Sequence, residues 1–528
     1  MYDVIIKNGT IIDGTGARMF RADVGVKENM IAAVGDLHND AAKQIIDATD
    51  QYVAPGFVDV NNHSDTYWQI FSNPHLESLV YQGITTVVGG NCGSSLAPLV
   101  NASMLQSIQK WADIRKINLN WLTMKEFLLE MERHALSVNF ATLSGHGTLR
   151  RGLVKDESRP LDARETATLL KMLKQSLKEG SFGCSLGLEY THAKNASATE
   201  LEALGETLKK QGGVYTVHLR DESEHLLDAL EEAVRIAQKS GCGLHISHLK
   251  AAGEEHWPSM EKALYLISAA QSNGLDITFD LYPYISTGTV LYTLLPQWVS
   301  EGGKRMMLER LKDPETRHEI IIELREKKRD YSKIVVLTSP LNQILVHQSI
   351  AAIAKNQNKS PEEALIYVLI ASGGRAVVSM EVVSEENIES AIQSPFSIIS
   401  TNGSGYSTDY ASTGERVHPR SFGTFPLVLA RYVKEKKLLS WEEAIHKMSG
   451  KPAEKFGIKD RGTLRKGKYA DIVVFHPSGV DSSATSENPY QYARGMNHVL
   501  VNGEISVKDG VYTGNRAGVV LRKSSPWF

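Results

Sequence analysis

The sequence predicts an α/β protein made of three parts: a (β/α)8 TIM barrel, a small β-sandwich domain built from both termini, and a helical insertion. Three observations lead to this fold. The chain has 528 residues, which is too long for one ordinary domain. Strand-like runs stand at both ends, and strand-like and helical runs alternate between them. One purely helical stretch interrupts that alternation.

Both ends of the chain read as β-structure. Near the N-terminus, "DVIIKNGTIIDG" and "ADVGVKENMIAAVG" are short apolar runs broken by Asn-Gly, Asp-Gly and Glu-Asn turn signals. Near the C-terminus, "YADIVVFHP" and "NHVLVNGEISVKDGVYTG" have the same character. Each piece alone would leave an apolar face exposed, so we expect residues 1–54 and 462–528 to pack as one sandwich domain.

The middle of the chain, residues 55–461, reads as repeated strand–helix units. Helical runs at 197–211 and 226–240 have apolar residues three and four apart. About eight such units over roughly 350 residues fit a parallel barrel better than an open doubly wound sheet. The strand-like runs are 56–63, 85–91, 138–147, 181–188, 213–220, 243–250, 276–284 and 396–403.

A helical stretch breaks the alternation after the seventh of these runs. Residues 292–328 read as consecutive helices, so we expect an insertion at about 289–332. Such a segment above the strand ends could be a lid over a site. It could equally be a helical excursion with no gating role.

Composition excludes several classes of function. A net charge of −3 gives no electrostatic basis for binding nucleic acid or an anionic membrane. The sequence has no apolar run of membrane-spanning length, no GxGxxG after a strand and no P-loop lysine pattern. We expect no signal peptide, because the N-terminal stretch has no basic start and no long apolar run. Three cysteines cannot form a disulfide framework in so long a chain, so we expect a cytoplasmic protein with reduced thiols. Both a single chain and a homo-oligomer are compatible with the sequence.

Candidate functional residues collect at the ends of the predicted strands, where the chemistry of such a barrel is found. One histidine or one cysteine there is more often a packing residue than a ligand. A cysteine and several histidines at the same end of successive strands are instead the donors that zinc prefers, which favours a metal site. The residues are Asn61, His63, Asp65, Asn91, Cys92, His146, His218, Arg220, His245, His248, Lys250, Asp280, Tyr282, Tyr284 and Asn402.

Several stretches match, in order, the motifs of one enzyme family. They are "VIIKNGTIIDGTG", "APGFVDVNNHSD", "QGITTVVGGNCGSSLAPL", "SGHGTLR", "YTVHLRDES", "HISHLK", "DLYPY", "VHPRSFGTFPLVLARYV" and "SGKPAEKFGIKDRGTLRKGKYADIVVFHP". With these motifs the chain resembles the amidohydrolase superfamily and, within it, the D-aminoacylases (N-acyl-D-amino-acid deacylases). "GGNCGSSLAP" and "HPRSFGTFP" are specific to that branch, whereas the terminal stretches occur across the superfamily.

The resemblance implies a function and a set of site residues. It implies a zinc-dependent hydrolase that cleaves the acyl amide bond of N-acyl-D-amino acids or close analogues. One tightly bound Zn²⁺ per chain is expected at Cys92, His218 and His248. The expected partner is a small-molecule substrate with a carboxylate, and the residues expected to bind it are Lys250, Tyr282, Arg420 and Tyr190.

The sequence departs from the family at two places. Asn61 stands where the first histidine of a His-x-His pair belongs, so the second metal site of the family is expected to be lost. Asn402 stands at the place of the catalytic aspartate, and an amide cannot exchange protons at ordinary pH. His63, Asp65 and Asp409 are the residues that could take over, although Asp65 could simply orient His63 or a loop and Asp409 could be a solvated loop carboxylate.

Two other functions therefore stay open. The chain could be a catalytically impaired binding protein that keeps the amidohydrolase fold, a reading that the two asparagines favour. It could also be an amidohydrolase acting on a cyclic amide. One sequence does not tell whether Asn402 is natural or an introduced substitution.

Overall fold

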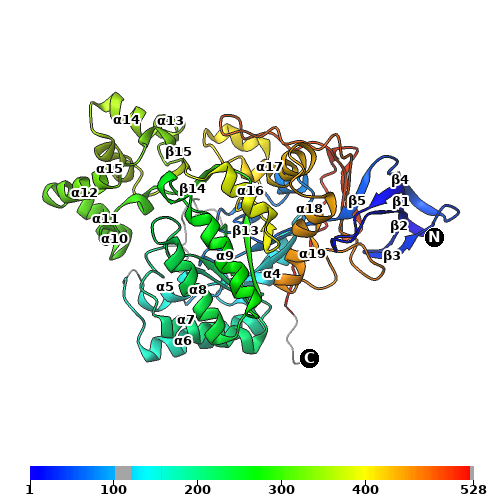
Figure 1. The fold of residues 1–528 in the computed structure, drawn as a ribbon, viewed down its shortest axis with the longest axis horizontal. Helices are drawn as coiled ribbons and strands as arrows, with labels where there is room; N and C mark the ends of the chain where they lie inside the picture. The colour runs from blue at the N-terminus through cyan, green and yellow to red at the C-terminus, as the bar shows by residue number, and fades with distance from the viewer. Residues whose placement is uncertain (101–119, 156, 524–528) are drawn as a thin grey trace.

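The computed structural model describes residues 1–100, 120–155 and 157–523 (Figure 1). It has a mixed α/β fold, which confirms the predicted class. Figure 1 places strands β1–β5 at one end of the molecule and helices α10–α15 at the other, with the remaining helices between them. No helix in the described ranges is long and apolar enough to cross a membrane.

Strands from both ends of the chain share one nine-stranded sheet. Its order is β21-β20-β19-β18-β5-β1-β2-β3, and β4 also pairs with β1. The two ends meet where β18 pairs antiparallel with β5, which itself runs parallel to β1. The strands are β1 (Tyr2–Ile11), β2 (Phe20–Lys27), β3 (Met30–Gly35), β4 (Ala42–Asp47), β5 (Tyr52–Pro55), β18 (Ile472–Phe475), β19 (Met496–Val501), β20 (Glu504–Lys508) and β21 (Val511–Tyr512).

All eight strand-like runs of the middle region contain a strand, and these strands pair in parallel. One group is β6–β7–β8 and the other is β9–β10–β11–β12–β13–β17. Only Leu143 separates β8 from β9, and a parallel bridge joins Asn62 to Gly403. The strands are β6 (Phe57–Asp59), β7 (Ile84–Gly89), β8 (Asn139–Thr142), β9 (Ser144–Gly145), β10 (Gly183–Gly187), β11 (Val214–His218), β12 (Leu244–Ile246), β13 (Ile277–Leu281) and β17 (Ser397–Ile399).

Helices between these strands begin and end at capping residues that the sequence supplies. Helix α7 begins after Ser197, whose hydroxyl accepts the Glu200 N–H, and it ends at Gly212 with a positive φ of 64°. The larger helices of the middle and C-terminal regions are α4 (Met124–His134), α5 (His146–Val154), α6 (Ala163–Lys178), α7 (Ala198–Gln211), α8 (Leu226–Ser240), α9 (Ser259–Ser272), α16 (Glu385–Gln393), α17 (Arg420–Leu427), α18 (Trp441–Met448) and α19 (Gly450–Phe456).

Between β13 and β17 the chain leaves the parallel strands and builds a unit with its own core. The predicted insertion at about 289–332 falls inside this longer segment, which also contains the antiparallel sheet β14-β16-β15. Its buried apolar side chains, from Leu291 to Val378, form a cluster separate from the main core. The elements are β14 (Ser286–Val290), α10 (Gln297–Ser300), α11 (Gly303–Lys312), α12 (Pro314–Glu326), β15 (Ile334–Thr338), α13 (Asn342–Leu345), α14 (Ile350–Gln357), α15 (Pro361–Ala371) and β16 (Val377–Glu381).

Candidate metal and substrate site

Cys92, His218 and His248 come together at the carboxyl ends of three parallel strands. Cys92 follows β7, His218 is the last residue of β11, and His248 follows β12. The Cys92 Sγ lies 3.3 Å from His248 Nε2, and that nitrogen lies 3.0 Å from His218 Nδ1. All three residues are buried, and their donor atoms lie within 4.8 Å of one another. A thiolate and two imidazoles can hold a zinc ion and leave a fourth position open.

The backbone around this cluster is strained in the way that functional sites often are. Cys92, His248 and Asn402 have positive φ angles of 51°, 38° and 45°, which non-glycine residues rarely adopt. Each of the three lies two or three residues beyond the end of a strand.

Two carboxylates hold the outer nitrogens of the histidines. The Glu189 carboxylate lies 2.8 Å from His218 Nε2, and the Glu222 carboxylate lies 2.9 Å from His248 Nδ1. Metal-binding histidines commonly donate their second N–H to a carboxylate in this way. Sequence reasoning missed both glutamates, although Glu222 lies in the stretch "YTVHLRDES" and Glu189 lies two residues beyond the end of β10.

The electrostatics of the cluster favour a thiolate. Burial raises the pKa of the Cys92 thiol, but the charge of His248 and hydrogen bonds with the surrounding histidines outweigh burial and hold that pKa well below its usual value. Burial lowers the pKa of His218, but the Glu222 carboxylate and hydrogen bonds to Cys92 and Glu189 raise it to about 10. A metal ion must displace the proton that this raised pKa keeps on His218, so its binding strengthens as pH rises.

Asn61 and His63, the pair at which a second metal site is expected to be lost, form hydrogen bonds with neighbouring side chains. The Asn61 Nδ2 donates to both oxygens of Asp280, at 3.3 and 3.4 Å. The His63 Nε2 lies 2.9 Å from Asn402 Oδ1 and 4.0 Å from Cys92 Sγ. Across the described residues, the clusters of three or more His, Cys, Asp and Glu donors are the cysteine–histidine cluster and the group Glu189, His218 and Glu222, and neither includes His63.

The other two acidic candidates have different surroundings. Asp65 is buried, and its oxygens accept the backbone N–H groups of Thr66 and Gly90 at 2.8 and 2.7 Å. Burial raises the pKa of Asp65, and the charge of His63, which lowers it, offsets this effect only in part. These contacts fix the loop that leads to Cys92, which is the orienting role that the sequence left open. Asp409 lies on the exposed surface.

The four predicted substrate residues surround the same region. Arg420 is only 6 % exposed, and its Nη1 has no hydrogen-bond partner among the described residues. Its guanidinium lies over the Tyr282 ring, 4.9 Å from the centroid, and the Tyr282 hydroxyl donates to Thr287. Lys250 is bound to Glu222 at 2.5 Å, and the Tyr190 ring lies 4.9 Å from the ring of His218. A buried guanidinium with a free N–H is suited to binding an anion.

His146 and Arg220, which the sequence also offered, belong to structural networks. The His146 Nε2 lies 2.7 Å from a carboxylate oxygen of Glu200, whose other oxygen pairs with the buried Arg150. Arg220 pairs with Glu232 at 2.8 Å. The first contact ties the start of α5 to α7, and the second ties the loop after β11 to α8.

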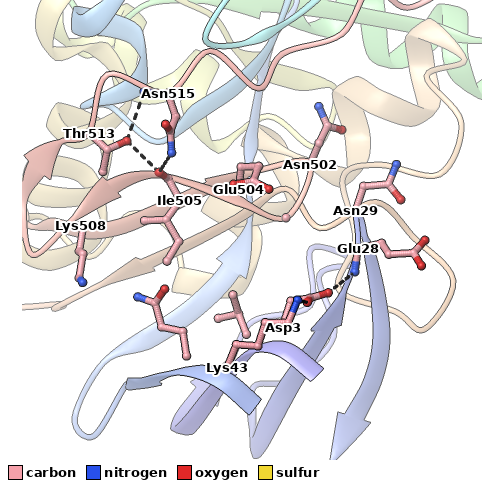
Figure 2. A pocket seen from close by; sticks show the side chains of 13 residues that line it. Asp3, Glu28, Asn29, Lys43, Asn502, Glu504, Ile505, Lys508, Thr513 and Asn515 are labelled. Carbon is pink, nitrogen blue, oxygen red and sulfur yellow. Dashed lines mark hydrogen bonds and ion pairs between the residues drawn. The ribbon is translucent and has the colours of Figure 1, made fainter. Parts of the chain in front are cut away.

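A groove of about 750 Å³ lies far from this cluster in sequence, on the nine-stranded sheet (Figure 2). Four of its polar side chains are engaged with their neighbours. Lys43 pairs with Asp3 at 2.7 Å, and Thr513 and Asn515 both donate to the carbonyl oxygen of Ile505. The groove therefore offers less chemistry than the cysteine–histidine cluster.

Comparison with known proteins gives a consistent result. The amidohydrolase family model matches residues 406–507. A D-aminoacylase of Alcaligenes xylosoxydans xylosoxydans is 31% identical, with 99% of this chain and 98% of that protein covered. A solved structure of D-aminoacylase, described as having a binuclear metal centre with one-metal activation and second-metal attenuation, superposes with a TM-score of 0.84 at 32% identity, covering 99% of this chain and 100% of that one.

A second solved structure extends the comparison to an acidic substrate. N-acyl-D-glutamate deacylase from Bordetella bronchiseptica, complexed with zinc and a phosphonate inhibitor, superposes with a TM-score of 0.82 at 30% identity, covering 99% of this chain and 100% of that one. The chain therefore belongs to the amidohydrolase superfamily. Because its similarity to D-aminoacylase extends over the whole length of both proteins, it belongs to the D-aminoacylase branch, as the sequence motifs predicted.

Proposed function

We propose that this protein is a zinc-dependent hydrolase that cleaves the acyl amide bond of N-acyl-D-amino acids or close analogues. The observation that carries the proposal is the buried Cys92–His218–His248 cluster at the strand ends. Zinc bound there would polarise the amide carbonyl and lower the pKa of a bound water from 15.7 towards about 7. The zinc complex of the similar N-acyl-D-glutamate deacylase supports this choice of metal.

One zinc ion per chain is the stoichiometry that the residues support. The Asn61 amide nitrogen donates to Asp280, and an asparagine has no imidazole or carboxylate to offer a second ion. Asn402 likewise presents a neutral amide to His63. The similar D-aminoacylase is described as activated by one metal and attenuated by a second, which supports catalysis by a single-metal site.

His63 takes over the proton transfer that Asn402 cannot perform. A histidine is the commonest general acid and base, and His63 lies 4.0 Å from the Cys92 sulfur without belonging to the cluster. Its Nε2 accepts the proton of the attacking water and gives it to the leaving amine nitrogen. Once Nε2 carries that proton, it can donate to the Asn402 Oδ1, 2.9 Å away, which stabilises the protonated ring until the proton passes to the amine.

Arg420 and Tyr282 orient the substrate through its carboxylate. The free Nη1 of the buried Arg420 can donate to that carboxylate, and Tyr282 holds the guanidinium in place by stacking beneath it. Lys250 and Tyr190 complete the pocket on the side of His218 and His248. The fixed anion places the acyl amide against the zinc.

The remaining sequence predictions extend this proposal. We propose that the parallel strands close into one (β/α)8 barrel at 55–461, supported by the Asn62–Gly403 bridge between the two groups of strands. The nine-stranded sheet then belongs to the sandwich domain of residues 1–54 and 462–528, and 289–332 is the helical insertion. Three unpaired, buried cysteines support a cytoplasmic location.

The proposal is tested by metal analysis and a hydrolysis assay on the same preparation. We expect about one zinc per chain and release of free amine from N-acetyl-D-amino acids, with neutral and acidic side chains compared and the L isomers as controls. Zinc without turnover would favour the impaired binding protein, which the two asparagines suggest. Turnover of a cyclic amide alone would favour the amidohydrolase that acts on cyclic amides. A metal-free protein would exclude hydrolysis by this mechanism.

Replacing Arg420 by methionine should raise KM for N-acyl-D-amino acids by at least about 30-fold, because losing one partner of a buried charge pair costs about 2 kcal/mol or more. The control is the corresponding N-acyl-D-amino acid amide, which lacks the carboxylate and should respond far less. Steady-state kinetics on both substrates give the answer. An equal rise in KM for both would mean that Arg420 does not bind the carboxylate.

A further inference from the structure

Glu222 is a largely buried carboxylate whose two oxygens have different partners. Its side chain is 13 % exposed, Oε1 lies 2.9 Å from His248 Nδ1, and Oε2 lies 2.5 Å from Lys250 Nζ. Its backbone carbonyl accepts the Ala252 N–H at 2.7 Å, which ties the loop after β11 to the loop after β12. One side chain thus touches both a residue of the metal cluster and a residue of the substrate pocket.

The two partners of Glu222, His248 and Lys250, also contact each other. The Lys250 Nζ lies 3.0 Å from the same His248 Nδ1, and it also donates to the His248 carbonyl at 3.0 Å. An ammonium group has only hydrogens to offer, so in a direct contact Nδ1 must accept. A neutral imidazole has one N–H, and it would then carry that hydrogen on Nε2. The Nε2 atom faces Cys92 and His218, so the metal would lose its donor.

We propose that Glu222 is a positioning residue that selects the metal-binding tautomer of His248 against the neighbouring Lys250. By accepting from His248 Nδ1–H with one oxygen, it leaves the lone pair of Nε2 free for the metal. By accepting from Lys250 with the other oxygen, it keeps the ammonium from imposing the opposite tautomer. This inference rests on the proposed function, because it assumes that the cluster holds zinc.

The arrangement also links the metal site to the substrate pocket. Glu222 and the His248 carbonyl occupy two of the three hydrogens of the Lys250 ammonium, which leaves one for a substrate carboxylate. Glu222 therefore fixes the direction of that remaining N–H at the same time as it fixes His248. Zinc affinity and carboxylate recognition share one supporting side chain.

Glu189 provides a matched comparison within the same site. It accepts from the outer nitrogen of His218 at 2.8 Å, as Glu222 does for His248, but it is 34 % exposed. The two histidines differ in one respect. Lys250 lies within hydrogen-bond distance of His248 Nδ1, whereas the contact recorded for His218 Nε2 is with the Glu189 carboxylate. Loss of Glu189 should therefore weaken zinc binding without any dependence on Lys250.

The test is a double-mutant cycle on zinc affinity, measured by competition with a chelator at fixed pH. Glu222→Gln should weaken zinc binding by about 10- to 100-fold. Lys250→Met alone should change it little, and the Glu222→Gln/Lys250→Met double variant should regain most of the loss because the competing cation is gone. Glu189→Gln should lose the same affinity with and without Lys250→Met.

Two outcomes overturn this inference: an unchanged zinc affinity in Glu222→Gln, or a loss that is the same with and without Lys250. If Glu222→Gln does not fold, as judged by thermal unfolding of the zinc-free protein, the cycle is repeated with Glu222→Asp, for which the same pattern is expected with smaller changes. If the unaltered chain binds no zinc, the proposed function falls together with the inference. If it binds zinc and the cycle shows no coupling, the inference alone is wrong.

Discussion

Replacing Cys92 by alanine is expected to remove zinc from the protein and to lower amide hydrolysis by more than about 100-fold. Changing a residue that merely supports a metal ligand typically costs about 10- to 100-fold in metal affinity or activity, and loss of a ligand must cost more. Cys92 is also the only sulfur donor of the cluster, and the two remaining imidazoles are a weak site for zinc. Metal content after dialysis and turnover of an N-acetyl-D-amino acid are the two measurements.

Cys242 supplies the matched control. It is buried and unpaired like Cys92, but its sulfur lies 3.1 Å from the Ser240 hydroxyl at the end of α8 rather than beside a histidine. Cys242→Ala should therefore keep its zinc and its activity. A Cys92→Ala variant with normal zinc content would show that the metal lies elsewhere, and equal losses in the two variants would indicate a general effect on folding.

The predicted strand ends indicated a metal site, and the family resemblance selected its three ligands from the residues found there. Cys92, His218 and His248 come from distant parts of the chain, but each stands at the carboxyl end of a strand, and those ends meet at one edge. Alternating strand-like and helical runs also located the strands, and apolar residues three and four apart located helices α7 and α8. These signals are local, so one sequence carries them.

What the sequence missed depends on contacts that no local signal encodes. The hydrogen bond from the Gly90 N–H to Asp65 is one such contact, because only the folded loop brings the two groups together. Glu222 binds His248 because two loops lie side by side, and a glutamate in "HLRDES" reads equally well as a solvated charge. The insertion is a second example. Its helices could be predicted from the local sequence, but the pairing of β14 with β16 could not, because it joins residues at opposite ends of the segment.

Replacing Asn402 by aspartate is expected to raise kcat/KM for the hydrolysis of an N-acetyl-D-amino acid by about 100-fold. General acid–base catalysis contributes about 10²- to 10⁴-fold, and the new carboxylate would stand 2.9 Å from His63 Nε2 and near the Cys92 sulfur. We expect the lower end of that range because His63 already transfers protons in the unaltered chain. Kinetics are measured at one equivalent of zinc, since a carboxylate beside His63 and Cys92 could attract a second ion.

A second substitution separates the two proton-transfer groups. His63→Ala should lower activity by about 10²-fold or more in the unaltered chain, because no other group there exchanges the proton. In the Asn402→Asp background the same change should cost much less, because the carboxylate then performs the transfer. If Asn402→Asp leaves the rate unchanged while zinc remains bound, the pocket is not a deacylase pocket that lacks only its base. The protein would then act on another substrate or serve as a binding protein.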